Sequence, residues 1–378
     1  MGVASWEGCT PMADLSAGKR CFSGRAMALA VILFLGLGAG CAHSSVSGVI
    51  NNGQLLAMAI NPRPVPPPMP QDLINAANLA FNAGVRGTVA NDTWADLEPA
   101  PGMYALQNIQ GQIGFFGRAG FEVFAGIQMI NTVAKTTPAD LQSVAWDDPK
   151  MKARFHGLLD ALRPSLASGV KYLSIGNEVD VYLAAHPNEW GPFQSFYEDA
   201  LAYVHQTMPG IQVGVTTTFD GASGTSSANV AQLNTQSDAW ILTYYPGTGD
   251  FQFTNPRAPL ADFPRMMSLA GNRPVVLQEV GYASSLLLGS SESDQAAFVG
   301  NVFQAWRAAG KRMPFLSYFL LHDFTPEVCS ALANYYGDPN DPNFQAYLCT
   351  LGLRHTDGTP KAGWQTFVTT AAGDGFPR

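Results

Sequence analysis

From residue 55 to the C-terminus, short apolar runs alternate with longer segments whose apolar residues recur at helical spacing. The first run, 55–61, reads LLAMAIN, and the helical segment after it ends on Gly84, a common C-terminal stop. Further apolar runs predict strands at 85–91, 121–131, 170–177, 211–218, 239–245, 273–279 and 313–321. A helix or helical segment is predicted after each strand.

Strands separated by helices in this way favour parallel pairing, and eight such units predict a closed (β/α)8 TIM barrel. The alternative is a doubly wound open sheet, but no glycine-rich dinucleotide-binding motif follows the first strand. We therefore expect one catalytic domain over residues 55–378, with residues 42–54 as a short tether. In such a barrel the active site lies at the C-terminal ends of the strands.

Residues 1–41 have a different pattern and predict an export signal. Basic residues precede an apolar run from Met27 to about Gly40, which is too short to span a bilayer comfortably. The run ends in LGAGC, which resembles the lipobox of bacterial lipoproteins, although Gly38 stands where such boxes usually carry Leu. Two outcomes stay open: a lipid anchor on Cys41, or cleavage after Ala42 and free secretion. Either outcome places the protein in the bacterial periplasm, on the cell surface or outside the cell.

Composition limits the classes of molecule that the protein is expected to bind. The formal net charge is −8 and no basic cluster follows residue 41, which argues against nucleic acid. Outside the leader and the possible lipid site, the cysteines are Cys329 and Cys349. In an exported protein such a pair predicts a disulfide, and no histidine is spaced to complete a metal site. We expect no cofactor.

Two of the predicted strands end on a glutamate. The fourth ends in LSIGNE, which places Glu178 there, and the seventh ends in VVLQE, which places Glu279 there. These strands lie on opposite sides of the barrel mouth, so both carboxyl groups can point inward. A pair of opposed carboxyl groups, one protonated and one ionised, is what glycoside hydrolysis requires.

These motifs resemble those of the clan A glycoside hydrolases, a superfamily of retaining (β/α)8 enzymes. The resemblance covers the mature chain and includes VRGTVANDTWADLEPAPGMY, ILTYYPG and GLRHTDGTPKAGWQTF. It implies that Glu178 is the general acid/base and Glu279 the nucleophile, with carboxyl groups about 5–5.5 Å apart. It also implies the supporting residues: Asn177 would bind the sugar 2-hydroxyl, Arg86 would lie beside the nucleophile, and Tyr244 or Tyr245 would contact it.

One position departs from the clan A pattern. Many of these enzymes end the eighth strand with a Trp beneath the sugar, but this chain reads FLSYFLLHDF. The residues that could replace it are Phe319, His322 and Phe324. Trp94 and Trp190 follow the second and fourth strands, where they either stack on sugar faces or belong to the core.

The remaining candidates are in loops. Asp180, two residues after Glu178, is expected to be a loop acid or helix cap. The segment YYGDPNDPNF is expected to make turns rather than bind calcium, and its aromatic residues could form a rim over the pocket.

The sequence thus predicts an exported retaining hydrolase that acts on a β-linked glycan or oligosaccharide. A transglycosylase that remodels surface glycan would need the same residues. A non-catalytic carbohydrate-binding lipoprotein on the same scaffold is the other alternative, although a binding protein has no need of two opposed glutamates.

Overall fold

The computed structural model describes residues 53–376, so the predicted leader and Cys41 lie outside the described part of the chain. Its parallel strands follow the order β6-β5-β3-β2-β1-β10-β9-β8-β7. They are β1 (Leu55–Met58), β2 (Gly87–Thr93), β3 (Glu122–Asn131), β5 (Val170–Asn177), β6 (Gln212–Gly214), β7 (Thr216–Thr218), β8 (Trp240–Tyr244), β9 (Val275–Val280) and β10 (Phe315–Tyr318).

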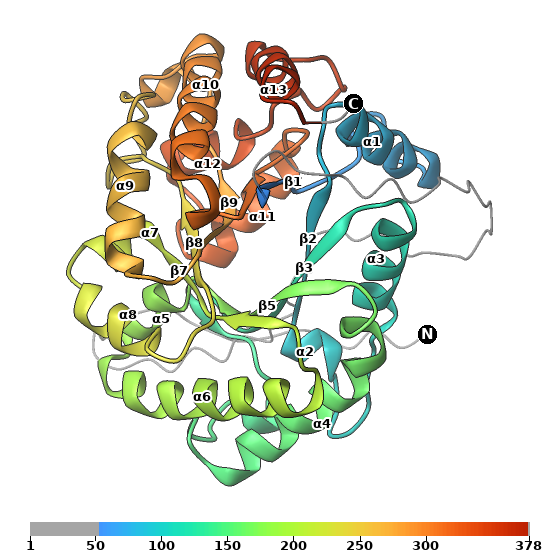
Figure 1. Ribbon diagram of the computed structural model, residues 1–378, viewed down its shortest axis with the longest axis vertical. Helices are drawn as coiled ribbons and strands as arrows, with labels where there is room; N and C mark the ends of the chain where they lie inside the picture. The colour runs from blue at the N-terminus through green and yellow to red at the C-terminus, as the bar shows by residue number, and fades with distance from the viewer. Residues whose placement is uncertain (1–52, 377–378) are drawn as a thin grey trace, which may run out of the picture.

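The two ends of this order, β6 and β7, are parts of one predicted strand that is interrupted only at Val215. Since β6 pairs with β5 and β7 with β8, the sheet curls into a nearly closed ring, seen along its axis in Figure 1. Counting β6 and β7 together gives the eight strands of the predicted barrel, so the (β/α)8 fold is confirmed. A short strand, β4 (Ala134–Lys135), pairs antiparallel with β3 and was not predicted.

The helices are α1 (Pro70–Asn82), α2 (Trp94–Leu97), α3 (Gln107–Arg118), α4 (Pro149–Leu166), α5 (Val179–Ala185), α6 (Trp190–Thr207), α7 (Phe219–Ser223), α8 (Ser227–Leu233), α9 (Pro259–Ala270), α10 (Glu292–Ala309), α11 (Pro326–Tyr336), α12 (Pro342–Cys349) and α13 (Ala362–Gly373). The longer ones surround the ring on the outside, whereas α11 and α12 lie over it in the view of Figure 1. Several begin at a side-chain cap; Asp148, for example, accepts a hydrogen bond from the Lys150 amide at the start of α4. Within residues 53–376, no helix is both long and apolar enough to cross a bilayer.

Alternation along the strands divides the core into two layers. Leu56 and Met58 of β1 pack outward in the large cluster shared with the helices, whereas Leu55 and Ala57 belong to a small cluster inside the ring. The inner cluster also contains three aromatic side chains in mutual contact, Phe124, Tyr172 and Phe315.

Nearer the C-terminal ends of the strands, the buried side chains are polar. Ser174, Thr216 and Gln278 come from β5, β7 and β9 and form a continuous hydrogen-bonded chain. Apolar side chains thus fill the inside of the ring, and the polar side chains lie above them at the C-terminal mouth of the barrel, where the fold class predicts the active site.

Candidate active site

Glu178 lies where β5 turns into α5. Its backbone is left-handed, with φ 47° and ψ 43°, a conformation that costs a non-glycine residue free energy and tends to occur at functional sites. Its carboxylate accepts a hydrogen bond from Thr132 Oγ1 (2.8 Å), beyond the end of β3. A second comes from Thr243 Oγ1 on β8 (2.7 Å). The carboxylate is therefore held from two directions at the mouth of the barrel.

Glu279, on β9, has different partners. Tyr245 donates its hydroxyl to Oε2 (2.6 Å), and Gln278 Nε2 lies 3.2 Å from Oε1. The same Gln278 amide donates to Asn177 Oδ1 (2.8 Å), while Asn177 Nδ2 donates to Asn131 Oδ1 (3.2 Å). A continuous polar network thus joins the ends of β3, β5 and β9 and brings Asn177, Tyr245 and Glu279 together.

The electrostatics of the two carboxyl groups are linked. Burial in the barrel mouth, together with the charge of Glu178, raises the pKa of Glu279 to about 7, although the bonds from Tyr245 and Gln278 act in the opposite direction. Burial also raises the pKa of Glu178, aided by the charge of Asp220 and opposed by the bonds from Thr243 and Thr132. Two neighbouring carboxyl groups with raised pKa values retain a proton near neutral pH more readily than isolated ones.

A cavity of about 150 Å3 opens beside Glu178. Aromatic rings make up much of its wall, together with threonine hydroxyls and one further carboxyl group. Its lining residues are Glu178, Thr218, Phe219, Asp220, Thr243, Tyr245, Gly247, Thr248, Phe251, Phe253 and Tyr347. A concave site with aromatic walls and a few polar groups is typical of small-molecule binding sites and suits the apolar faces of sugar rings.

The segment after β10 covers the mouth. Helix α11 reaches across it, because the Tyr335 hydroxyl donates to the carbonyl of Asn131 at the end of β3 (2.8 Å). Helix α12 contributes Tyr347, which stacks on Phe253 with ring centroids 5.6 Å apart. The three rings predicted as a rim, Tyr335, Tyr336 and Phe344, do not line the cavity; Phe344 is buried against Phe251, and Tyr347 lines the cavity instead.

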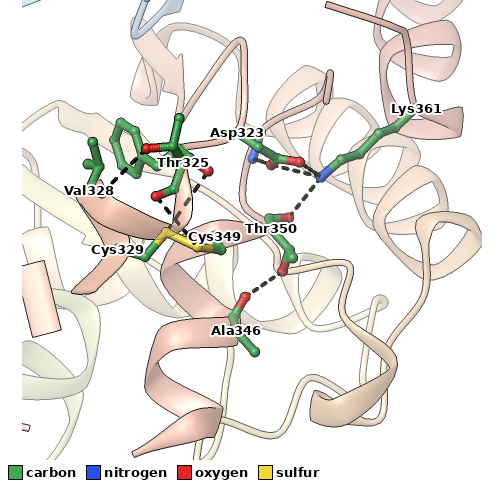
Figure 2. Close-up of a disulfide and its surroundings, with 10 residues drawn as sticks. Asp323, Thr325, Val328, Cys329, Ala346, Cys349, Thr350 and Lys361 are labelled. Atoms are coloured by element: carbon green, nitrogen blue, oxygen red, sulfur yellow. Dashed lines mark hydrogen bonds and ion pairs between the residues drawn. A yellow bond between two sulfur atoms is a disulfide. The ribbon is translucent and has the colours of Figure 1, made fainter. Parts of the chain in front are cut away.

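The disulfide predicted between Cys329 and Cys349 is confirmed and joins α11 to α12 (Figure 2). Beside it, the buried Lys361 ammonium lies 2.7 Å from Asp323 Oδ2 and 3.2 Å from the carbonyl of Thr350, the residue after α12. These contacts fix the base of the covering segment to the barrel.

The same segment accounts for the Asx residues of YYGDPNDPNF. Asp341 caps α12 by accepting hydrogen bonds from the amides of Asn343 and Phe344, which is the turn-making role expected of it. Among residues 53–376, no three His, Cys, Asp or Glu side chains are grouped as metal ligands.

The prediction for Arg86 is wrong. Arg86 immediately precedes β2, whereas the carboxyl groups lie at the C-terminal ends of β5 and β9. Its guanidinium donates to the carbonyls of Phe81 and Val85 and lies over the Phe81 ring at 3.5 Å. Seven strand residues at about 3.3 Å each separate the two ends of β2 by roughly 20 Å. Arg86 therefore belongs to the opposite end of the barrel.

The tryptophan candidates do not line the cavity either. Trp94 is 0% exposed, packs against Phe155 and Phe196, and donates its indole N–H to Glu98, so it is a core residue. Trp190 begins α6, where it is partly buried against the core.

The choice between the two tyrosines is settled by strand alternation. Tyr245 reaches Glu279, whereas Tyr244 points toward the helices and donates to Asp262 (2.6 Å). His322 faces away from the cavity: its Nδ1 is paired with the Asn61 carbonyl (2.8 Å), and burial lowers its pKa to about 4. Phe319, another candidate to replace the expected Trp, lies edge-on to Tyr245 with ring centroids 6.1 Å apart.

Asp180 is not a solvated loop acid. Only 3% exposed, it accepts hydrogen bonds from the amide and hydroxyl of Thr218, and burial raises its pKa to about 7. Sequence reasoning also missed Thr132, Thr243 and Asp220 as neighbours of Glu178. Position at a strand end could have indicated Thr243, but no local signal identifies Thr132, because β4 and its turn place it.

The fold resembles that of known glycoside hydrolases. It superposes on a GH5_18 protein from Streptomyces cattleya in complex with GlcNAc with a TM-score of 0.67, at 16% identity, over 85% of this chain and 80% of that one. Exo-beta-1,4-mannosidase Op5Man5 from Opitutaceae bacterium strain TAV5 gives 0.65 at 16% identity, over 85% and 59%. A family 39 glycoside hydrolase from Bacteroides cellulosilyticus WH2 gives 0.54 at 15% identity, over 85% and 64%.

Families 5 and 39 both belong to clan A, so the fold implied by the resemblance is confirmed. At these identities the likeness concerns the fold. Neither a protein-family model nor a curated protein sequence matches the chain.

Proposed function

We propose that the protein is a retaining glycoside hydrolase that cleaves a β-linked glycan or oligosaccharide. The observation that carries this proposal is that Glu178 and Glu279 project from opposite sides of the barrel into one mouth. There, burial and the charge of Glu178 raise the pKa of Glu279 to about 7. The clan A fold supports it, since the similar structures include an exo-beta-1,4-mannosidase.

The hydrogen-bond partners support a division of labour between the two acids. The Nε2 group of Gln278 can only donate, and together with the Tyr245 hydroxyl it favours an ionised Glu279, the state of a nucleophile. Glu178 meets two threonine hydroxyls, which can accept a hydrogen bond from a protonated carboxyl group as well as donate one to a carboxylate. Glu178 can therefore keep its proton and serve as the general acid.

In the first step, the Glu279 carboxylate attacks the anomeric carbon while the bond from that carbon to the leaving oxygen breaks. Glu178 gives its proton to that oxygen, which leaves a glycosyl ester on Glu279 and a free alcohol. In the second step, Glu178 takes a proton from water as the water oxygen attacks the same carbon and the ester bond breaks. Asn177, fixed by Gln278 and Asn131, is positioned to bind the 2-hydroxyl.

Nucleophile rescue tests this assignment. Glu279→Ala should abolish turnover of a panel of aryl β-glycosides, and added azide should restore it as a glycosyl azide of inverted configuration. Glu198→Ala, on the outer helix α6, is the matched control and should retain wild-type turnover. Full activity of Glu279→Ala would rule out its role. A single-step product of inverted configuration from the wild-type enzyme would replace double displacement by an inverting mechanism.

The alternatives give different products in the same assay. A transglycosylase would form longer oligosaccharides at low water-to-sugar ratios instead of reducing ends. A carbohydrate-binding protein would bind the glycan without forming any product.

We also propose that the chain is exported and anchored through a lipid on Cys41. The basic residues, the apolar run and LGAGC support this proposal. Expression with radiolabelled palmitate should label the wild type in the membrane fraction and leave Cys41→Ser unlabelled and soluble. Label in both proteins, or in neither, would refute the anchor.

A further inference from the structure

The cavity lies on one side of the proposed reaction centre. Glu178 lines it, whereas Glu279 does not. In a double displacement the nucleophile lies beneath the anomeric carbon, and the general acid contacts the oxygen that leaves. If these roles hold, a cavity beside the acid alone receives the group attached to that oxygen. The structure thus locates the leaving-group side, and this inference rests on the proposed function.

The walls of this cavity suit one sugar ring. They include Phe219 from α7, Phe251 and Phe253 from the loop after β8, and Tyr347 from α12. Phe251 has a left-handed backbone, with φ 61°, so its ring is held in place at some conformational cost. A volume of about 150 Å3 is large enough for a single sugar ring.

Most polar side chains of the cavity are already engaged inside the protein. The hydroxyl of Thr218 donates to Asp180, that of Thr243 to Glu178, and that of Thr248 to Asp250. Asp220 is different. Its carboxyl group has no hydrogen-bond or ion-pair partner among the described residues, although it lines the cavity wall.

The surroundings of Asp220 contain no compensating cation. Within residues 53–376, no lysine or arginine forms an ion pair with it or lines the cavity, and the nearby Asp262 adds negative charge. Arg265, which lies over the Phe219 ring, donates instead to the carbonyl of Ser223. A carboxylate without a cation can accept hydrogen bonds from hydroxyl groups and repels other carboxylates.

We propose that Asp220 determines leaving-group specificity by accepting hydrogen bonds from hydroxyl groups of an uncharged sugar that stacks between the aromatic walls. A glycan in which this sugar is a uronic acid is excluded, because its carboxylate would face that of Asp220.

The test compares two leaving groups in one enzyme. Hydrolysis of a p-nitrophenyl β-glycoside needs no sugar hydroxyl in the cavity, whereas hydrolysis of the β-linked disaccharide of the same sugar does. Losing a hydrogen bond to a charged group corresponds to a loss of about ten-fold or more in kcat/KM. Asp220→Asn should therefore lower the ratio of disaccharide to aryl-glycoside kcat/KM about ten-fold. Asp147→Asn, which makes the same charge change at an exposed site outside the cavity, should leave the ratio unchanged.

The outcomes separate the two proposals. If the wild type cleaves neither substrate across the glycoside panel, the proposed function fails and this inference fails with it. If the wild type cleaves both and Asp220→Asn loses both equally, only the role of Asp220 is refuted. Equal cleavage by the wild type of disaccharides that end in a hexose and in a uronic acid would refute the charge exclusion.

Discussion

The hydroxyl of Tyr245 lies 2.6 Å from Glu279 Oε2, while the hydroxyl of the adjacent Tyr244 lies 2.6 Å from Asp262 on α9. Two consecutive tyrosines thus make the same kind of bond, one inside the barrel mouth and one outside it. The same Tyr-to-Phe substitution can therefore be made at both positions, and only the carboxyl group that loses its hydrogen bond differs.

Tyr245→Phe should lower kcat by about ten-fold or more, since a hydrogen bond to a charged group contributes about 1.5–3 kcal/mol. Loss of the donor should also raise the pKa of Glu279, because that bond now lowers it. Activity should then begin at a higher pH. Tyr244→Phe should keep the wild-type pH profile, and equal effects of the two variants would contradict the assignment.

The proposed roles predict a bell-shaped pH profile. Activity should rise as Glu279 ionises and fall when Glu178 loses its proton. Because a protonated Glu178 no longer repels the Glu279 carboxylate, the rise should lie below pH 7. Thr243→Val removes a bond that lowers the pKa of Glu178, so the descending limb should move to higher pH. Thr243→Ser keeps the hydroxyl and should keep the wild-type limb. A shift toward lower pH in Thr243→Val would contradict Glu178 as the acid.

The disulfide should contribute to stability and to the cavity. Replacing both Cys329 and Cys349 by Ser should reduce the free energy of unfolding by about 3 kcal/mol, measured by urea titration. Because α12 carries Tyr347, KM for a disaccharide should also increase. The wild type after reduction and alkylation should behave like the double variant. An unchanged unfolding midpoint in both the double variant and the reduced wild type would show that the disulfide does not stabilise the fold.

The Lys361–Asp323 pair predicts a pH-dependent stability loss. Both side chains are buried, at 2% and 7% exposure, so Lys361→Met should cost about 3–5 kcal/mol by leaving a buried carboxylate unpaired. Burial already raises the pKa of Asp323 to about 6, above its usual 3.8. A group with a raised folded pKa stabilises the protein as pH falls, so the loss should be smaller at pH 5 than at pH 8.

The control for that experiment removes the carboxylate as well. Lys361→Met combined with Asp323→Asn should recover part of the lost stability, as measured by urea titration at pH 8. If the double variant were no more stable than the single one, the unpaired charge would not be the cause.

The sequence was sufficient to predict the barrel and the position of the two glutamates at strand ends, because strand ends and their apolar runs are local features. It was not sufficient for Arg86. There a motif resemblance placed the residue at the mouth, although its position before the strand puts it at the opposite end. For Trp94 the sequence left sugar stacking and core packing open; the chain enters a helical turn directly after β2, which directs the indole into the core.

Residues brought in by other segments could not be predicted. Thr132 contacts Glu178 across 46 positions of the chain, and Tyr335 contacts Asn131 across 204. A raised pKa alone would not have identified the site either, since burial also raises the pKa of Asp92 to about 6, where its partner Asn108 is structural. Three non-glycine residues in the described chain have a left-handed backbone, Thr132, Glu178 and Phe251, and all three lie at this mouth.

The interruption of the barrel between β6 and β7 has a consequence for how the enzyme would fail. Thr216, just past the gap, bonds to both Ser174 and Gln278, and Gln278 in turn orients Asn177 and Glu279. The same hydrogen bonds thus hold the ring together at this seam and align the reacting groups. If the hydrogen bonds at this seam broke, Asn177 and Glu279 would lose their alignment while most of the helices were still packed, so inactivation would precede unfolding.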